Sequence, residues 1–157
     1  MQLKVLTPVL LAFLFVFGCT KEVNQNTAEN EAIQIKDWLD TMANNNTKVE
    51  TTTTGLYFVT QTVGTGATVK AGDTVTVEYT AMFLNGSVFD SSSNFVYIHK
   101  AAGQRMIQGW EEGIEILSKG GSAVFLIPSA KAYGVNGYLA IPPYTPLLFM
   151  INVIDIK

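Results

Sequence analysis

After Gly55, apolar and polar residues alternate along the chain in short runs that turn residues separate. One face of residues 74–84 carries Val75, Val77, Tyr79, Ala81 and Phe83. This period of two predicts a strand with one buried face. Further strands are predicted at residues 56–62, 122–128 and 147–156. Asn85-Gly86 follows the 74–84 strand and predicts a type I′ hairpin turn.

A single helix is predicted inside this region, over residues 108–118. Trp110, Ile114 and Leu117 recur there at helical spacing, and Gly120-Gly121 supplies a stop signal typical of helix C-termini. Several antiparallel strands with one helix laid on them predict a small α+β domain over residues 55–157.

The N-terminus carries an apolar run over residues 5–17, preceded by Lys4 and followed by Gly18-Cys19. The run is shorter than the about 18 to 20 residues that span a bilayer, which favours an export signal. A small residue before the cysteine resembles the lipobox of bacterial lipoproteins. That resemblance implies a signal peptide over residues 1–18, lipidation of Cys19 and anchoring in the cell envelope, at the outer membrane. An ordinary secretory signal with an incidental cysteine is the alternative.

Residues 19–54 are expected to form a polar tether. Within it, Ala32, Ile35, Leu39 and Met42 recur at helical spacing, which predicts a short amphipathic helix near residues 32–42. Its apolar stripe could dock on its own domain, on a second copy or on a partner.

Composition excludes several classes of chemistry. Ten Lys and Arg residues against thirteen Asp and Glu residues give a net charge of −3, so the cationic surface that nucleic-acid binding needs is absent. One cysteine and one histidine allow neither an intrachain disulfide nor a multi-histidine metal site, and no cofactor is predicted. His99 lies in a polar, irregular segment, and nothing supports a catalytic triad around it. Glu111 and Glu112 are adjacent on the helix and are interpreted as charges that favour its N-terminus.

Six blocks of the sequence form one ordered set: Val77-Glu78-Tyr79-Thr80, Asn85-Gly86-Ser87-Val88-Phe89-Asp90-Ser91-Ser92, Ile107-Gln108-Gly109-Trp110-Glu111-Glu112-Gly113, Ala132-Tyr133-Gly134, Ile141-Pro142-Pro143 and Leu147-Leu148-Phe149. In order and spacing, these blocks resemble the FKBP family of peptidyl-prolyl cis/trans isomerases. The resemblance implies an antiparallel five-stranded curved sheet wrapped around one short helix, with an aromatic pocket between them.

By matching positions, the resemblance also implies the site residues. The catalytic set is Tyr79, Phe89, Asp90, Ile107, Trp110, Tyr133 and Phe149, and the substrate-binding set is Phe95, Tyr97, Met106, Ile141 and Tyr138. Trp110 would form the floor, the Ile107 N–H and the Tyr133 hydroxyl would hold the substrate backbone, and Asp90 would accept a hydrogen bond from Tyr79. Whether Phe95 or Tyr97 fills one pocket position stays open.

The implied function is isomerisation of proline-containing polypeptides, assisting the folding of exported or envelope proteins without covalent catalysis, with tacrolimus-type macrolides as inhibitors. A proline-segment-binding chaperone or envelope assembly factor with little turnover is the alternative. The chain departs from the family between Asp90 and Phe95, where it is about four residues shorter and where the arginine that usually pairs with the pocket acid has no counterpart.

Overall fold

The computed structural model describes residues 26–103 and 106–157. In chain order the elements are α1 (Ala28–Asn44), β1 (Glu50–Thr51), β2 (Tyr57–Thr62), β3 (Thr65–Thr68), β4 (Thr74–Phe83), β5 (Val88–Ile98), α2 (Gln108–Ile114), β6 (Ser118–Lys119), β7 (Ser122–Ile127), the 3-10 turn η1 (Ser129–Lys131) and β8 (Leu147–Ile156). The predicted signal peptide and Cys19 lie outside the described residues. None of the helices in the described ranges is long and apolar enough to cross a bilayer.

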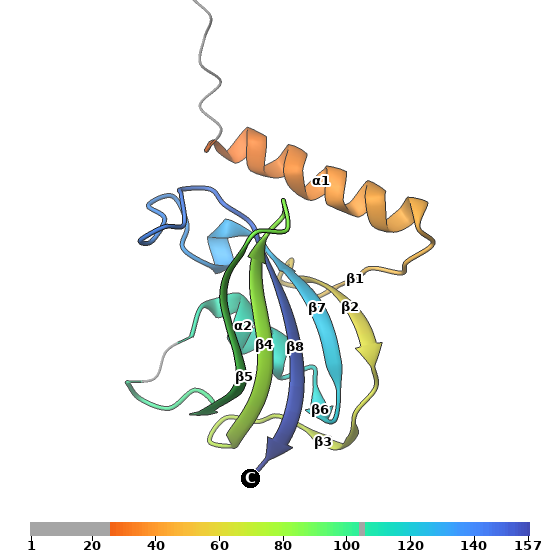
Figure 1. The fold of residues 1–157 in the computed structure, drawn as a ribbon, viewed down its shortest axis with the longest axis vertical. Coiled ribbons are helices and arrows are strands. Elements are labelled where there is room, and N and C mark those ends of the chain that lie inside the picture. The colour runs from red at the N-terminus through yellow and green to blue at the C-terminus, as the bar shows by residue number, and fades with distance from the viewer. Residues whose placement is uncertain (1–25, 104–105) are drawn as a thin grey trace, which may run out of the picture.

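The fold is a curved antiparallel sheet in the order β1-β2-β7-β8-β4-β5, with a separate two-stranded sheet of β3 and β6 (Figure 1). The alternation in residues 74–84 places Val75, Val77 and Ala81 on the buried face of β4, each fully buried. The predicted α+β fold with five main strands is confirmed, and the two-residue β1 extends the sheet at one edge. β1 comes from the segment that the sequence assigned to the tether.

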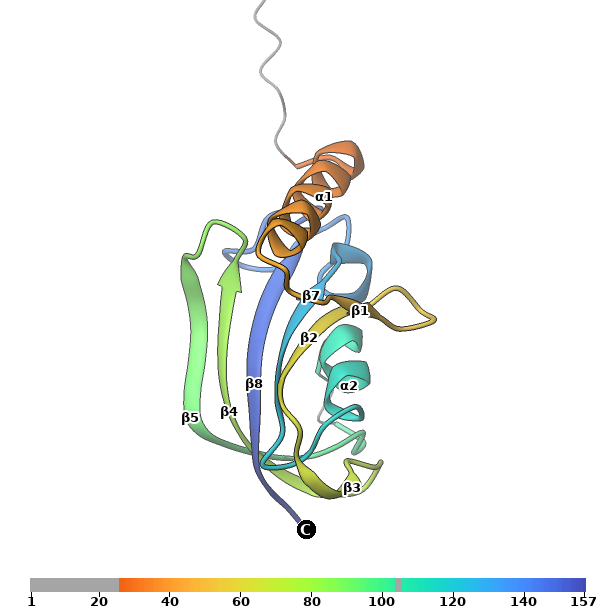
Figure 2. The same ribbon diagram turned by 90° about the vertical axis from the view of Figure 1, so that its right-hand side faces the viewer.

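Helix α2 packs on the inner side of the curve, beside β7 (Figure 2). Two glycines four residues apart allow this close approach. A Cβ at Gly109 would overlap the Ile127 side chain, and a Cβ at Gly113 would lie 2.9 Å from the Phe125 ring. With α2 this close to the sheet, Trp110 becomes completely buried.

The end of α2 differs from the prediction. The helix ends at Ile114 and not at residue 118. Leu117 is buried, as its helical spacing suggested, but its N–H bonds to the Ile114 carbonyl in a tighter turn, and the next two residues pair as β6 with β3. Gly120-Gly121 therefore connects β6 to β7 instead of ending the helix.

The turn between β4 and β5 is also not of the predicted type I′. That type needs a positive φ at both central residues. In the described residues Gly86 has a φ of +85°, whereas Asn85 is not among those with positive φ. The Gly86 N–H bonds to the Phe83 carbonyl at 2.9 Å, and the Asn85 side chain accepts from the Ser87 N–H at 2.9 Å. The Asn85 side chain thus caps a local turn.

Helix α1 extends beyond the predicted residues 32–42 at both ends and lies across the end of the sheet where β4 and β5 are joined (Figure 1). It contacts its own domain through Glu31, whose carboxylate accepts hydrogen bonds from the Ser129 N–H at 2.6 Å and the Ser129 hydroxyl at 2.7 Å. At its N-terminal side, Asn26 borders a hollow with Ala140 and Pro142 of the loop over residues 134–146, which is called the flap below.

Candidate functional site

A pocket of about 530 Å³ opens between α2, the sheet and the flap. It is lined by Tyr79, Phe89, Asp90, Met106, Ile107, Gln108, Trp110, Ala132, Tyr133, Tyr138 and Phe149. All seven residues of the predicted catalytic set border this one space, and Met106 and Tyr138 join them. Gln108 and Ala132 were not predicted as site residues, although both belong to the blocks that carry the family resemblance.

Aromatic rings packed edge to face form the body of the pocket. The Trp110 ring lies 5.1 Å from Tyr79 at 86° and 5.6 Å from Phe149 at 82°, measured between centroids and between ring planes. Phe89, on β5, lies 6.1 Å from Phe149 at 82°. Such edge-to-face pairs are favourable beyond the area they bury. The rings therefore hold one another in place and present an apolar surface.

The polar wall is formed by Tyr79 and Asp90, on paired strands β4 and β5. The Tyr79 hydroxyl donates to an Asp90 carboxylate oxygen at 2.7 Å. Burial, followed by the hydrogen bond to Asp90, raises the pKa of Tyr79 to about 12. Within the described ranges Asp90 forms no ion pair with a lysine or arginine.

Two hydrogen-bond donors border the pocket. Within the described residues, neither the Ile107 N–H nor the Tyr133 hydroxyl has a hydrogen-bond acceptor. Burial, followed by the nearby Tyr138 and Asp90, raises the pKa of Tyr133, so its hydroxyl keeps its proton at neutral pH. Tyr138 stacks on Tyr133 at 5.2 Å and 11°. The pocket thus offers two hydrogen-bond donors beside an aromatic surface.

Three residues of the predicted substrate-binding set, Phe95, Tyr97 and Ile141, do not line the pocket. Tyr97 is 4% exposed, and its hydroxyl accepts from the Trp110 indole N–H at 2.9 Å. Phe95 stacks on Tyr97 at 5.4 Å. Both rings pack against Trp110, with centroid distances of 6.3 Å for Phe95 and 6.1 Å for Tyr97.

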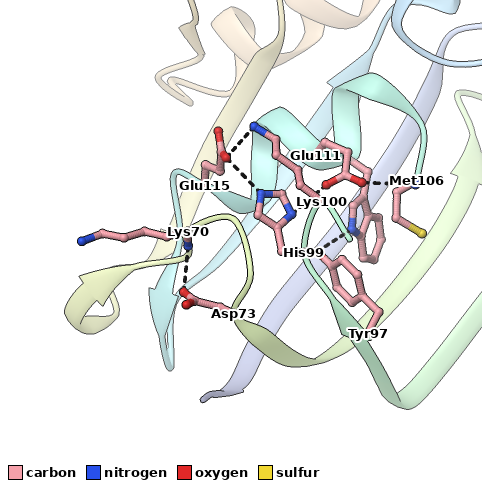
Figure 3. A network of polar contacts seen from close by, with 9 residues as sticks. Lys70, Asp73, Tyr97, His99, Lys100, Met106, Glu111 and Glu115 are labelled. Carbon is pink, nitrogen blue, oxygen red and sulfur yellow. Dashed lines mark hydrogen bonds and ion pairs between the residues drawn. The ribbon is translucent and has the colours of Figure 1, made fainter. Parts of the chain in front are cut away.

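Glu111 lies in the first turn of α2, where the sequence predicted a charge that favours the helix N-terminus, and both Glu111 and Glu112 also have specific partners. Glu111 faces His99 and the Met106 N–H (Figure 3), whereas Glu112 pairs with Lys131 of η1 at 2.8 Å. Burial raises the pKa of Glu112, but bonds from Lys131, Thr52 and Thr54 outweigh it and hold the pKa below its usual value. This second cluster anchors the turn that precedes Ala132 and Tyr133.

The observed environment of His99 differs from the one that its sequence context predicts. His99 is completely buried, although it was assigned to an irregular polar segment. Phe95, Tyr97 and His99 continue the alternation of β5, and this period of two was the available signal. In the part of the chain that the structure describes, no group of three His, Cys, Asp or Glu residues is arranged to hold a metal ion.

Comparisons with known proteins agree with this fold. A family model described as FKBP-type peptidyl-prolyl cis-trans isomerase matches residues 65–154. A protein named probable FKBP-type peptidyl-prolyl cis-trans isomerase from Haemophilus influenzae is 39% identical over 110 residues, which cover 69% of this chain and 46% of that protein. The isomerase FkpA from Escherichia coli K12 is 32% identical over 136 residues, covering 87% of this chain and 50% of FkpA.

Solved structures show the same likeness. The crystal structure of FkpA from Escherichia coli superposes with a TM-score of 0.72 at 33% identity, covering 83% of this chain and 60% of that one. A peptidyl-prolyl cis-trans isomerase from Pseudomonas syringae pv. tomato gives a TM-score of 0.65 at 28% identity and covers 80% and 95%. The chain spans about half the length of the curated relatives described above.

Proposed function

The chain belongs to the family of FKBP-type peptidyl-prolyl cis-trans isomerases, and from that premise we propose that it accelerates cis/trans isomerisation of Xaa-Pro bonds in polypeptides. The observation that carries the proposal is that one pocket brings together an aromatic surface, the Tyr79–Asp90 pair and two donors that have no acceptor within the described residues. No nucleophile or cofactor is needed, because no covalent bond is made or broken in the reaction.

The apolar surface acts on the barrier. Rotation about an Xaa-Pro bond passes through a twisted amide that has lost resonance, and the uncatalysed barrier is about 18–20 kcal/mol. Water hydrogen-bonds the planar amide better than the twisted one. Replacing water by the rings of Trp110, Phe89 and Phe149 removes that preference and lowers the relative free energy of the twisted state.

The donors set the orientation of the substrate. The Ile107 N–H and the Tyr133 hydroxyl can each donate a hydrogen bond to a substrate carbonyl, which fixes the backbone on both sides of the proline. Asp90 holds the Tyr79 hydroxyl at 2.7 Å, and this pair forms the wall against which the rotating carbonyl lies. Tacrolimus-type macrolides would compete for the same space.

The direct test is NMR exchange spectroscopy on a short Phe-Pro peptide with the full chain, purified in a mild detergent because of its apolar residues 5–17. Cis/trans exchange that tacrolimus suppresses is the expected result. Phe149→Ala removes a ring from the pocket and should abolish the acceleration. Phe58→Ala removes a ring that packs on Phe125 outside the pocket, and should retain it. Equal loss in both variants would contradict the assignment of the site.

A second candidate function is a binder of proline-containing segments with little turnover, acting as a chaperone or assembly factor. Its specific support is Asp90, which within the described residues lacks a cationic partner. Peptide binding at the pocket without accelerated exchange would favour this function over isomerisation.

The proposal includes export and lipid anchoring. Its support is the sequence alone: the apolar run over residues 5–17 and the small residue before Cys19. Diacylation of Cys19 would hold the domain at the envelope, in the outer membrane, where proline-containing exported proteins are the clients. Mass spectrometry of the mature N-terminus tests this. A chain that begins with acylated Cys19 is expected, and cleavage elsewhere with an unmodified Cys19 would refute it.

A further inference from the structure

His99 is a titratable side chain that the proposed reaction does not use. It is the last inward-facing residue of β5 and its turn, and it is completely buried. Its Nδ1 lies 2.7 Å from a Glu111 carboxylate oxygen, and its Nε2 lies 3.0 Å from a Glu115 carboxylate oxygen (Figure 3). A neutral imidazole has one N–H, whereas the imidazolium has two. Carboxylates close to both ring nitrogens therefore match the charged form: Nε2 forms a hydrogen bond with Glu115, and the contact of Nδ1 with Glu111 is an ion-pair contact without hydrogen-bond geometry.

The surrounding charges fit this arrangement. Glu111 and Glu115 are four residues apart, and like charges at that spacing repel when nothing lies between them. His99 lies between them. Lys100 also donates to Glu115, at 2.6 Å, and the bonds from Lys100 and then His99 lower the pKa of Glu115. From the loop before β4, the Asp73 backbone carbonyl accepts the His99 N–H at 2.9 Å, so the main chain of the histidine is also held.

Glu111 connects this cluster to the pocket. Its other carboxylate oxygen accepts a hydrogen bond from the Met106 N–H at 3.2 Å. Met106 lines the pocket, and so does the next residue, Ile107, whose N–H is one of the two pocket donors described above. A carboxylate pulled toward His99 on one side is thereby fixed as the acceptor for the pocket wall on the other.

We propose that His99 is a positioning residue for the pocket: as an imidazolium held between Glu111 and Glu115, it fixes the Glu111 carboxylate and, through the Met106 N–H, the segment that presents the Ile107 donor. The effect of His99 on catalysis rests on the proposed isomerase function. The link from His99 through Glu111 to the Met106 N–H does not, because it concerns only the wall of the pocket.

The test uses the full chain in detergent and compares three variants of similar side-chain size. His99→Gln removes the imidazolium. Glu111→Gln keeps an acceptor oxygen for Met106 but removes the charge that His99 attracts. Lys100→Gln is the matched control, because it removes a cation from Glu115 without touching Glu111. The readouts are amide hydrogen exchange at Met106, the KM and kcat for the peptide, and imidazole nitrogen NMR at neutral pH.

The wild-type ring should show protons on both nitrogens. The Met106 amide should exchange about tenfold faster in His99→Gln and in Glu111→Gln, since hydrogen bonds to charged groups are the stronger class, and less than twofold faster in Lys100→Gln. KM should rise about threefold or more with kcat little changed, because the donor is misplaced but the aromatic surface is intact.

Three results would overturn the proposal: a single protonated ring nitrogen, unchanged Met106 exchange in Glu111→Gln, or an equal rise in exchange at Val77 and Ile151 of the core, which would mark general loosening. Glu111→Gln keeps the test valid when His99→Gln fails to fold. If the wild-type chain shows no turnover, the isomerase function fails, while the exchange data still decide whether His99 holds the wall.

Discussion

Replacing Tyr97 by Phe separates support of the pocket from contact with the substrate. The Tyr97 hydroxyl is the acceptor for the indole N–H of Trp110, at 2.9 Å, and both residues are buried. Burial also raises the pKa of Tyr97, as expected for a hydroxyl closed off from water. The substitution keeps the ring that stacks on Phe95 but leaves the indole N–H without a partner. A buried donor left unsatisfied costs about 1–3 kcal/mol.

Urea unfolding measures this cost. With a slope of about 2 kcal/mol per molar urea, a loss of about 2 kcal/mol lowers the midpoint by about 1 M. The KM for a proline peptide should change less than twofold, because Tyr97 does not line the pocket. Tyr133→Phe is the matched comparison: its hydroxyl has no acceptor within the described residues, so the midpoint should stay while KM rises. An unchanged midpoint in Tyr97→Phe, or a larger rise in KM than in Tyr133→Phe, would refute the reasoning.

Three further predictions follow from packing and charge. The pKa of Tyr79 is raised to about 12 in the folded chain, from an ordinary value of 10.0. The protonated hydroxyl therefore contributes fully to stability below pH 10, and this contribution is lost as pH rises toward 12. Urea unfolding of Tyr79→Phe should show a smaller loss of stability at alkaline pH than wild type. Gly109→Ala would force a methyl group into Ile127 and should destabilise by about 1–3 kcal/mol through overpacking; an unchanged melting temperature would show that α2 can shift freely. Glu31→Gln weakens the charged bonds to Ser129, so amide exchange in α1 should accelerate while exchange in the main sheet stays constant.

The strands were predictable where a period of two is complete within the strand itself. In β4 the alternating residues Val75, Val77 and Ala81 bury one face without help from distant sequence, and the structure has them fully buried. The end of α2 was not predictable in this way. Leu117 continues the helical spacing, but the pairing of the following residues with β3 is a contact between segments about fifty residues apart, and that pairing ends the helix.

The site shows the same division. The residues that line the pocket were predicted from the resemblance of the motifs to the family, because no local sequence pattern distinguishes an aromatic residue of a pocket from one of the core. The roles of Tyr97 and His99 depend on what faces them. Each of the two meets α2, which begins about ten residues later in the chain. A polar histidine in a strand looks exposed until the two glutamates that surround it are placed, and only the fold places them.

The position of Asn26 beside the flap limits how far the pocket can lie from an anchor at Cys19. Asn26 borders the same hollow as Ala140 and Pro142 of the flap, and the flap also carries Tyr138 of the pocket. On the proposed anchoring at Cys19, the seven residues that lead to Asn26 reach at most about 25 Å when fully extended. The mouth of the pocket would then stay within a short radius of the bilayer surface. Access of a client chain to the pocket would then depend on its distance from the membrane. Newly translocated segments close to the membrane would be at a high local concentration near the pocket, so they would bind even when their intrinsic affinity is weak.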